Sequence, residues 1–191
     1  MSASDPVITA VGPDDLADLA ILFDSAGVTQ GCWCMWWRVP ARVFDAMTQP
    51  ERRATFEAQA MDHPPGLLAR IDGCPAGWVQ VTPRADLPRF NASRAGKAAK
   101  DTDLDRDWAM TCFFIHKDFR GQGLMEALGR AACVFAVQNG AAAVEAAAHV
   151  PSGDKLQWSD GYTGLAPVLS RVGFLPVGAQ SGRRQRMRWT A

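Results

Sequence analysis

The run from residue 113 to residue 125 constrains the fold most, because an apolar segment passes through two glycines straight into a second apolar segment. The first part, up to Ile115, has the composition of a buried strand, and the part after Gly123 repeats its apolar residues with helical spacing. A glycine turn at a helix start leaves backbone N–H groups free, and the helix dipole adds positive potential there. The run predicts a strand, a loop and a helix whose first turn binds a phosphate group; an ordinary strand-to-helix turn is the alternative.

Length and charge limit the classes of protein to consider. The chain has 191 residues, 48% of them apolar, so we expect one domain over residues 1–191. The 20 basic and 20 acidic residues balance, whereas domains that bind nucleic acid usually carry a basic excess, so we expect no nucleic-acid partner. We see neither a signal peptide nor an apolar stretch long enough to span a bilayer, and therefore predict a cytoplasmic protein without a membrane partner.

The five cysteines are irregularly spaced, and without an export signal we expect them to be reduced. Cys32 and Cys34 form a Cys-x-Cys pair, which is too short for the usual zinc ligand pair, and no second pair lies nearby. We therefore predict no metal site. A nucleophilic cysteine would need a base, and the sequence identifies none.

Apolar periodicity and turn residues predict the other elements. Strands are expected over residues 7–11, 67–71, 76–81, 108–116, 143–148, 174–177 and 184–189. Helices are expected over residues 13–26, 41–47, 48–62, 124–139 and 163–172, with Gly27 as the cap of the first. This order predicts an α/β (mixed α+β) fold, with helices on both faces of a mixed sheet. Residues 83–107 lack apolar periodicity, and a loop this long is typical of a lid, a binding loop, or a disordered or solvated charged segment.

The element order and three motifs resemble the GNAT superfamily of acetyl-CoA-dependent N-acyltransferases. The run RGQGLM at 120–125 is similar to its pyrophosphate loop, LLARIDGCPAGWVQVTP at 67–83 to its central hairpin, and LSRVGF at 169–174 to the short helix before its penultimate strand. The segments GCWCMWWR at 31–38 and GYTG at 161–164 also look like a bacterial subgroup of the family. The resemblance implies a GNAT fold with a central, mostly antiparallel sheet.

The resemblance further implies acetyl-CoA as co-substrate and a ternary complex in which an amine attacks the thioester. Backbone N–H groups at the start of the predicted helix would hold the pyrophosphate, Arg120 would pair with a phosphate oxygen, and the strand edge would hold the pantetheine arm. The cofactor-binding residues implied in this way are Phe114, Ile115, His116, Arg120, Gly121, Gln122, Gly123, Leu124 and Met125.

Two residues depart from the family pattern. Met125 stands where the family usually has glycine or alanine, so its side chain is expected to crowd the pyrophosphate, and Met125→Gly to raise the affinity for CoA. Leu169 stands where many members have a tyrosine that protonates the leaving thiolate. A GNAT-fold protein that binds acyl-CoA without turnover is therefore the alternative function.

The proton transfers need a base and an acid. Glu145 interrupts a run of small apolar residues, and burial among them would raise its pKa, so we predict it as the base; Asp107 and His116 are the other candidates, and a solvent-facing Glu145 is the alternative. Tyr162 lies just before the short helix and is the predicted acid, with Ser170 or a water molecule as rivals.

The acceptor is expected to be a primary amine of a small molecule or peptide. The resemblance puts residues 31–38 beside the acceptor pocket, where indoles would favour an aromatic, cationic or apolar amine and a guanidinium would bind a carboxylate. The predicted substrate-binding residues are Trp33, Trp36, Trp37 and Arg38. A tryptophan cluster that only packs helices onto the sheet is the alternative, and the choice between monomer and homodimer stays open.

Overall fold

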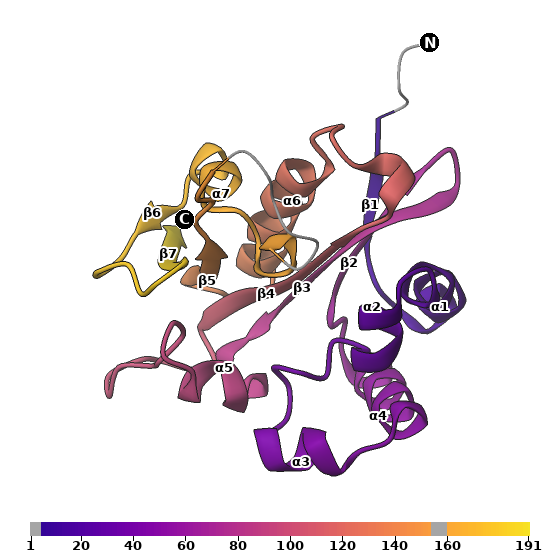
Figure 1. Ribbon diagram of the computed structural model, residues 1–191, viewed down its shortest axis with the longest axis horizontal. Helices are drawn as coiled ribbons and strands as arrows, with labels where there is room; N and C mark the ends of the chain where they lie inside the picture. The colour runs from indigo at the N-terminus through magenta and orange to yellow at the C-terminus, as the bar shows by residue number, and fades with distance from the viewer. Residues whose placement is uncertain (1–4, 154–159) are drawn as a thin grey trace.

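A seven-stranded sheet crosses the molecule in the computed structural model, which describes residues 5–153 and 160–191 (Figure 1). The strands follow the order β1-β2-β3-β4-β5-β7-β6. They are β1 (Val7–Ala10), β2 (Gly66–Ile71), β3 (Cys74–Pro83), β4 (Asp107–Ile115), β5 (Ala143–His149), β6 (Leu175–Pro176) and β7 (Arg184–Thr190). Neighbouring strands are antiparallel except β4 and β5, so the predicted mixed, mostly antiparallel sheet is confirmed.

Helices cover both faces of the sheet, as predicted (Figure 1). The α-helices are α1 (Leu16–Asp24), α2 (Gly27–Cys32), α3 (Ala41–Ala46), α4 (Gln49–Asp62), α5 (Pro88–Ala92), α6 (Leu124–Gln138) and α7 (Ala166–Val172). The 3-10 turns are η1 (Pro13–Asp15), η2 (Arg84–Asp86), η3 (Lys117–Phe119) and η4 (Asp160–Thr163). Gly27 begins α2, so its predicted role as the cap of the first helix is wrong. Within the described residues, no helix is both long and apolar enough to cross a bilayer.

Local signals fix several boundaries. The backbone N–H of Thr48 donates to the Glu51 carboxylate at 2.7 Å, and this capping box begins α4. The β2–β3 hairpin turns at Asp72 and Gly73, both with positive φ, as a type I′ turn requires. These signals involve residues close in sequence, which is why the elements could be placed without tertiary information.

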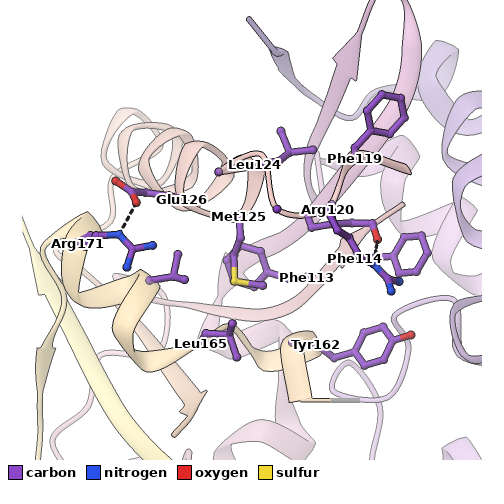
Figure 2. Close-up of a pocket in the computed structure, with 15 residues that line it drawn as sticks. Phe113, Phe114, Phe119, Arg120, Leu124, Met125, Glu126, Tyr162, Leu165 and Arg171 are labelled. Carbon is purple, nitrogen blue, oxygen red and sulfur yellow. Dashed lines mark hydrogen bonds and ion pairs between the residues drawn. The ribbon is translucent and has the colours of Figure 1, made fainter. Parts of the chain in front are cut away.

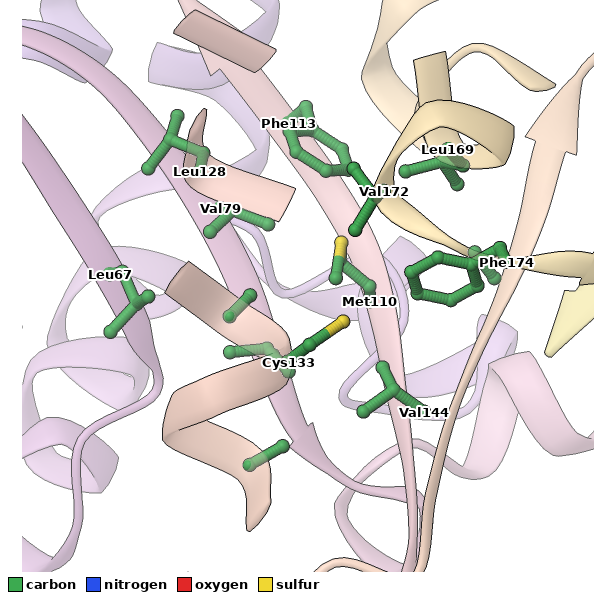
Figure 3. Close-up of a cluster of buried hydrophobic side chains, with 14 of the residues drawn as sticks. Leu67, Val79, Met110, Phe113, Leu128, Cys133, Val144, Leu169, Val172 and Phe174 are labelled. Carbon is green, nitrogen blue, oxygen red and sulfur yellow. The ribbon is translucent and has the colours of Figure 1, made fainter. Parts of the chain in front are cut away.

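The main core lies between the sheet and the pair α6 and α7 (Figure 3). Its labelled members are Leu67, Val79, Met110, Phe113, Leu128, Cys133, Val144, Leu169, Val172 and Phe174. Gly77 allows α6 to approach β3, because a Cβ there would come within about 3 Å of Ile115, Leu124 and Leu128. The packing therefore holds the first turn of α6 close to the end of β4.

A second core on the opposite face holds α1 and α4 against the sheet. Trp33 is fully buried there, and its ring meets those of Phe23 and Phe56 edge to face, with centroids 5.3 and 6.1 Å apart. Trp78 of β3 packs against the same two phenylalanines. This aromatic cluster anchors the N-terminal helices.

The strands β4 and β5 part from each other halfway along their length. They pair only from Asp107↔Ala143 to Ala109↔Glu145. The β3–β4 register then shifts, because Val81 pairs with Met110 but Gln80 pairs with Cys112, and such a bulge bends and twists a strand. The turn η4 contacts both strands beyond this point. A cleft therefore opens between the C-terminal halves of β4 and β5.

The segment over residues 83–107 is anchored on the sheet and contains η2 and α5. Arg84 is fully buried, and its guanidinium donates to the Glu145 carboxylate, the Asn91 side chain and the Gly96 carbonyl. Leu87 and Phe90 are also buried. The alternative of a solvated charged loop is therefore wrong for residues 84–96, whereas residues 97–106, with the acidic run, are exposed or half-buried.

Candidate active site

A cavity of about 520 Å³ lies between α6 and α7, at the cleft between the two parting strands (Figure 2). Its lining comprises Phe113, Phe114, Ile115, Phe119, Arg120, Gly121, Gly123, Leu124, Met125, Glu126, Gly161, Tyr162, Leu165, Val168 and Arg171. The structure thus brings most of the predicted cofactor-binding residues together with the predicted acid, Tyr162. Gln122 and His116 are next to this lining but are not part of it.

The loop before α6 has the geometry of an anion site. Gly121 and Gly123 have φ values of 76° and 78°, a conformation that residues with a Cβ rarely adopt. Helical hydrogen bonding begins with Glu126, whose N–H donates to the Gly123 carbonyl at 2.9 Å. No group of the described residues accepts from the backbone N–H groups of residues 121–125. These donors therefore surround the positive end of the α6 dipole.

Two side chains hold this loop against the strand end. Arg120 donates from Nε to the Ile115 carbonyl at 3.1 Å, and Gln122 donates to the Asp118 carbonyl at 3.1 Å. Within residues 5–153 and 160–191, the terminal nitrogens of Arg120 have no hydrogen-bond partner, so they are available to an anion. His116 instead caps η3, where its Nδ1 accepts from the Asp118 N–H at 3.4 Å.

The end of β4 has a free backbone edge on the side of the cavity. The His116 N–H donates to the Ala76 carbonyl of β3 at 2.9 Å. Because successive residues of a strand direct their hydrogen bonds to opposite sides, Phe113 and Ile115 direct theirs toward the cleft. Phe114 therefore contributes its side chain to the site rather than a backbone edge.

Tyr162 lies under the end of β4, its ring stacked on that of Phe114 with centroids 6.3 Å apart and an interplanar angle of 11°. Burial raises the pKa of the Tyr162 phenol, and the neighbouring Cys112 thiol adds to the effect. The phenol is therefore protonated at neutral pH and able to donate. Leu169, in contrast, is fully buried in the main core.

Met125 projects into the cavity toward η4 (Figure 2). A Cβ built on Gly161 would lie only 3.7 Å from the Met125 Cε, so the thioether spans the gap between α6 and η4. The side chain therefore occupies part of the cavity, and its crowding of the pyrophosphate stays a prediction.

Arg171 is a site residue that the sequence analysis missed. Its Nε donates to Glu126 at 2.7 Å, and Arg130 donates to the same carboxylate at 2.9 Å. The hydrogen bonds from Arg171 and then Arg130 lower the pKa of Glu126. This pairing ties α7 to α6 on either side of the cavity. The position of Arg171 within the LSRVGF motif was the sequence signal that could have identified it as a site residue.

The structure corrects the prediction that Glu145 is the base. Glu145 is fully buried below the cleft and accepts from Arg84 at 2.5 Å, Arg186 at 2.8 Å and Arg188 at 2.7 Å. Burial alone would raise its pKa, but the hydrogen bonds from Arg186 and Arg188 and the charge of Arg84 outweigh this and lower it. The carboxylate therefore holds arginines in place, and the expectation of a raised pKa is wrong.

The structure also corrects two of the predicted substrate-binding residues. Trp33 is fully buried in the second core, so a substrate cannot contact it. Arg38 is buried as well, and its guanidinium donates to Gln80, Gln59 and the Pro65 carbonyl at 3.0, 3.1 and 3.4 Å, so each of its nitrogens is already engaged inside the protein.

The cysteines of the same segment are poor nucleophiles. Burial raises the pKa of Cys32 to about 12, and burial likewise raises the pKa of Cys34 well above its ordinary value. The thiolate is the reactive form, so neither residue is activated. Within the described part of the chain, no cluster of three or more histidine, cysteine or acidic residues has the geometry to hold a metal ion.

Comparison with known proteins gives consistent findings. Residues 33–155 match the model of the acetyltransferase (GNAT) family, and no curated protein sequence matches the chain. The GNAT domain of S. lividans PAT is 15% identical, with a TM-score of 0.58 over 96% of this chain and 89% of that one.

Two further solved structures are similar in fold. AAC(6')-Ib in complex with paromomycin and acetyl-CoA is 15% identical, with a TM-score of 0.59 over 98% of this chain and 94% of that one. The PaiA N-acetyltransferase from Thermoplasma acidophilum in complex with coenzyme A is 12% identical, with a TM-score of 0.55 over 98% of this chain and 99% of that one.

Proposed function

The chain belongs to the GNAT acetyltransferase family, and on this premise we propose that it transfers the acetyl group of acetyl-CoA to a primary amine of a small molecule. The observation that carries the proposal is the convergence of a glycine loop with free N–H donors, a free strand edge and a protonated tyrosine on one cavity. The aminoglycoside acetyltransferase with a similar fold was solved with acetyl-CoA and an aminoglycoside, which supports a small-molecule amine as acceptor.

The cavity residues have separate tasks in this proposal. The backbone N–H groups of residues 121–125 bind the pyrophosphate, and Arg120 and Arg171 add positive charge beside it. The N–H groups of Phe113 and Ile115 and the Phe113 carbonyl bind the amide groups of pantetheine, because the Ile115 carbonyl already accepts from Arg120. The thioester then lies near Tyr162, below the point where β4 and β5 part.

The reaction itself needs one bond to form and one to break. The amine nitrogen bonds to the thioester carbonyl carbon, the carbon–sulfur bond breaks and the thiolate takes a proton. The nitrogen gives up one proton, which returns through water to the group that protonated the thiolate. We assign the proton taken by the thiolate to the Tyr162 phenol, because it lines the cavity and its pKa is raised. Asp107 is paired with Arg188 through two hydrogen bonds and is therefore no free base.

We expect Tyr162→Phe to lower kcat roughly a hundredfold, which is typical for loss of one general acid. The KM for acetyl-CoA should stay nearly constant, because the ring stacked on Phe114 is kept. Steady-state kinetics together with a thermal unfolding curve check this. An unchanged kcat in the folded variant would remove Tyr162 from the mechanism.

We expect Met125→Ala to lower the Kd for acetyl-CoA by roughly three- to tenfold, a gain of up to about 1.4 kcal/mol. Removing the thioether opens the gap between α6 and Gly161. Isothermal titration calorimetry measures the change, with the solvent-exposed Val134→Ala on the same helix as control. A weaker affinity in Met125→Ala would show that the side chain contacts the ligand favourably instead.

The proposed reaction is tested by release of free CoA over a panel of primary amines, with acetyl-CoA binding measured separately. Amine-dependent release with matching N-acetylated product supports transfer. Saturable binding with no release on any amine would favour the alternative, a protein that binds acyl-CoA without turnover. A cytoplasmic location and a possible homodimer stay predictions from the sequence.

A further inference from the structure

A second cavity, of about 610 Å³, lies on the other face of the sheet, between α3 and α5. Its walls include Trp36, Trp37, Pro40, Pro88, Arg89 and Ser93. Two of the predicted substrate-binding residues, Trp36 and Trp37, are therefore brought together here rather than in the cavity between α6 and α7.

Trp37 lines the second cavity and also packs onto the part of the sheet where β4 and β5 still pair. It packs against a buried cluster that includes Ala109 of β4 and Ala147 of β5. Ala109 is in the last β4–β5 pair before the strands separate, and its neighbours Trp108 and Met110 face the main core on the opposite side. Through Trp37, the second cavity therefore borders the paired part of these two strands, from which the cleft begins.

Among the described residues, Arg89 is the one basic side chain in this lining. Its guanidinium lies over the Trp36 ring, with Cζ 3.4 Å from the centroid, and 5.8 Å from the centroid of Phe44. No carboxylate of the described residues pairs with it, and its Nη1 is buried without a hydrogen-bond partner in that part of the chain. The arginine is therefore oriented by an aromatic ring rather than by an anion.

We propose that the second cavity binds the acceptor, and that this acceptor has a carboxylate and a flat apolar body in addition to its amine. The proposal rests on the proposed function. The indoles bind the apolar body, and the planar guanidinium of Arg89 binds the carboxylate through two parallel hydrogen bonds. The single charge of the Arg89 guanidinium matches the single charge of a carboxylate better than the higher charge of a phosphate group. Arg89, rather than the expected Arg38, is therefore the residue proposed to bind the carboxylate.

The experiment compares acceptors that differ only in the carboxylate, phenylalanine against phenethylamine and leucine against isopentylamine. Binding is measured without acetyl-CoA by the change in tryptophan fluorescence, and acetyl transfer is measured separately. We expect each carboxylated amine to bind the wild-type protein at least tenfold more tightly than its partner. Arg89→Gln should abolish this difference.

Two further variants keep the result interpretable. Arg94→Gln removes an exposed arginine from the same segment and should leave the preference unchanged. Arg89→Lys keeps the charge but loses the planar guanidinium, so the preference for the carboxylated amine should fall without vanishing. If Arg89→Gln does not fold, Arg89→Lys takes its place in the experiment.

The outcomes separate this inference from the proposed function. A carboxylate preference that depends on Arg89, without any acetyl transfer, would uphold the binding site and contradict the reaction. Transfer at equal rates to both members of each pair, unaffected by Arg89→Gln, would uphold the reaction and overturn the inference. Failure of either carboxylated amine to bind would also overturn it.

Discussion

Replacing Glu145 with glutamine is expected to lower the free energy of unfolding by about 3–5 kcal/mol, the usual cost of removing one partner from a buried ion pair. The carboxylate is fully buried and is the shared acceptor of Arg84, Arg186 and Arg188. An amide in its place leaves the charge of the fully buried Arg84 uncompensated in the interior, whereas Arg188 keeps its pair with Asp107. Urea denaturation measures the loss.

The same variant should loosen the segment over residues 83–107. Arg84 joins this segment to β5 through Glu145, and Arg186 of β7 also donates to the Lys97 carbonyl. Limited proteolysis of Glu145→Gln should therefore cut between residues 84 and 107 earlier than in the wild type. As control, Glu57→Gln breaks the partly exposed pair with Arg53 on α4 and should cost only about 0.5 kcal/mol.

The pH dependence of stability gives an independent check. The folded-state pKa of Glu145 is lowered, so its contribution is present above the unfolded pKa of about 4.3 and is lost as the pH falls through the folded value. The stability difference between wild type and Glu145→Gln should therefore shrink in acid. Unchanged stability combined with a large loss of kcat would contradict this reading and restore Glu145 as the base.

Replacing Gly123 with aspartate is expected to weaken acetyl-CoA binding roughly a hundredfold, which corresponds to about 2.7 kcal/mol. The residue is the N-cap of α6, with a φ of 78°, in open space and beside the free N–H groups. Aspartate tolerates this backbone conformation at a cost of about 1–2 kcal/mol, so the fold should survive. Its carboxylate would compete with the pyrophosphate for the same donors and repel it.

Gly140→Asp provides the matched control. Gly140 lies just after the other end of α6, also with a positive φ of 90° and open space around a Cβ. The two variants therefore carry similar backbone strain and the same added charge. Equal Kd values for acetyl-CoA in the two variants, measured by calorimetry, would show that the glycine loop is not the pyrophosphate site.

Much of the fold could be predicted because its signals are local. The Thr48–Glu51 capping box, the Asp72-Gly73 turn and the glycines before α6 each act through residues adjacent in the chain. The glycine loop and Tyr162 were singled out from these signals together with the family resemblance. The two do lie on one cavity, although their roles stay predictions.

The errors concern residues whose environment depends on distant parts of the chain. Glu145 is stabilised by Arg84, which is 61 positions away, so no local pattern reveals that the carboxylate is paired. Trp33, Trp36 and Trp37 are nearly adjacent, yet the left-handed backbone at Trp33 and Cys34 turns the first indole into the core while the others line the second cavity. Arg89 had no distinguishing sequence signal.

The central claim is that acetyl-CoA binds across the glycine loop and the free edge of β4. Amide hydrogen exchange followed by NMR, with and without acetyl-CoA, tests this most directly. The account predicts slower exchange at the N–H groups of residues 121–125 and at Phe113 and Ile115, and no comparable change at Gly140. Saturable binding of acetyl-CoA that leaves exchange at these amides unchanged would contradict it.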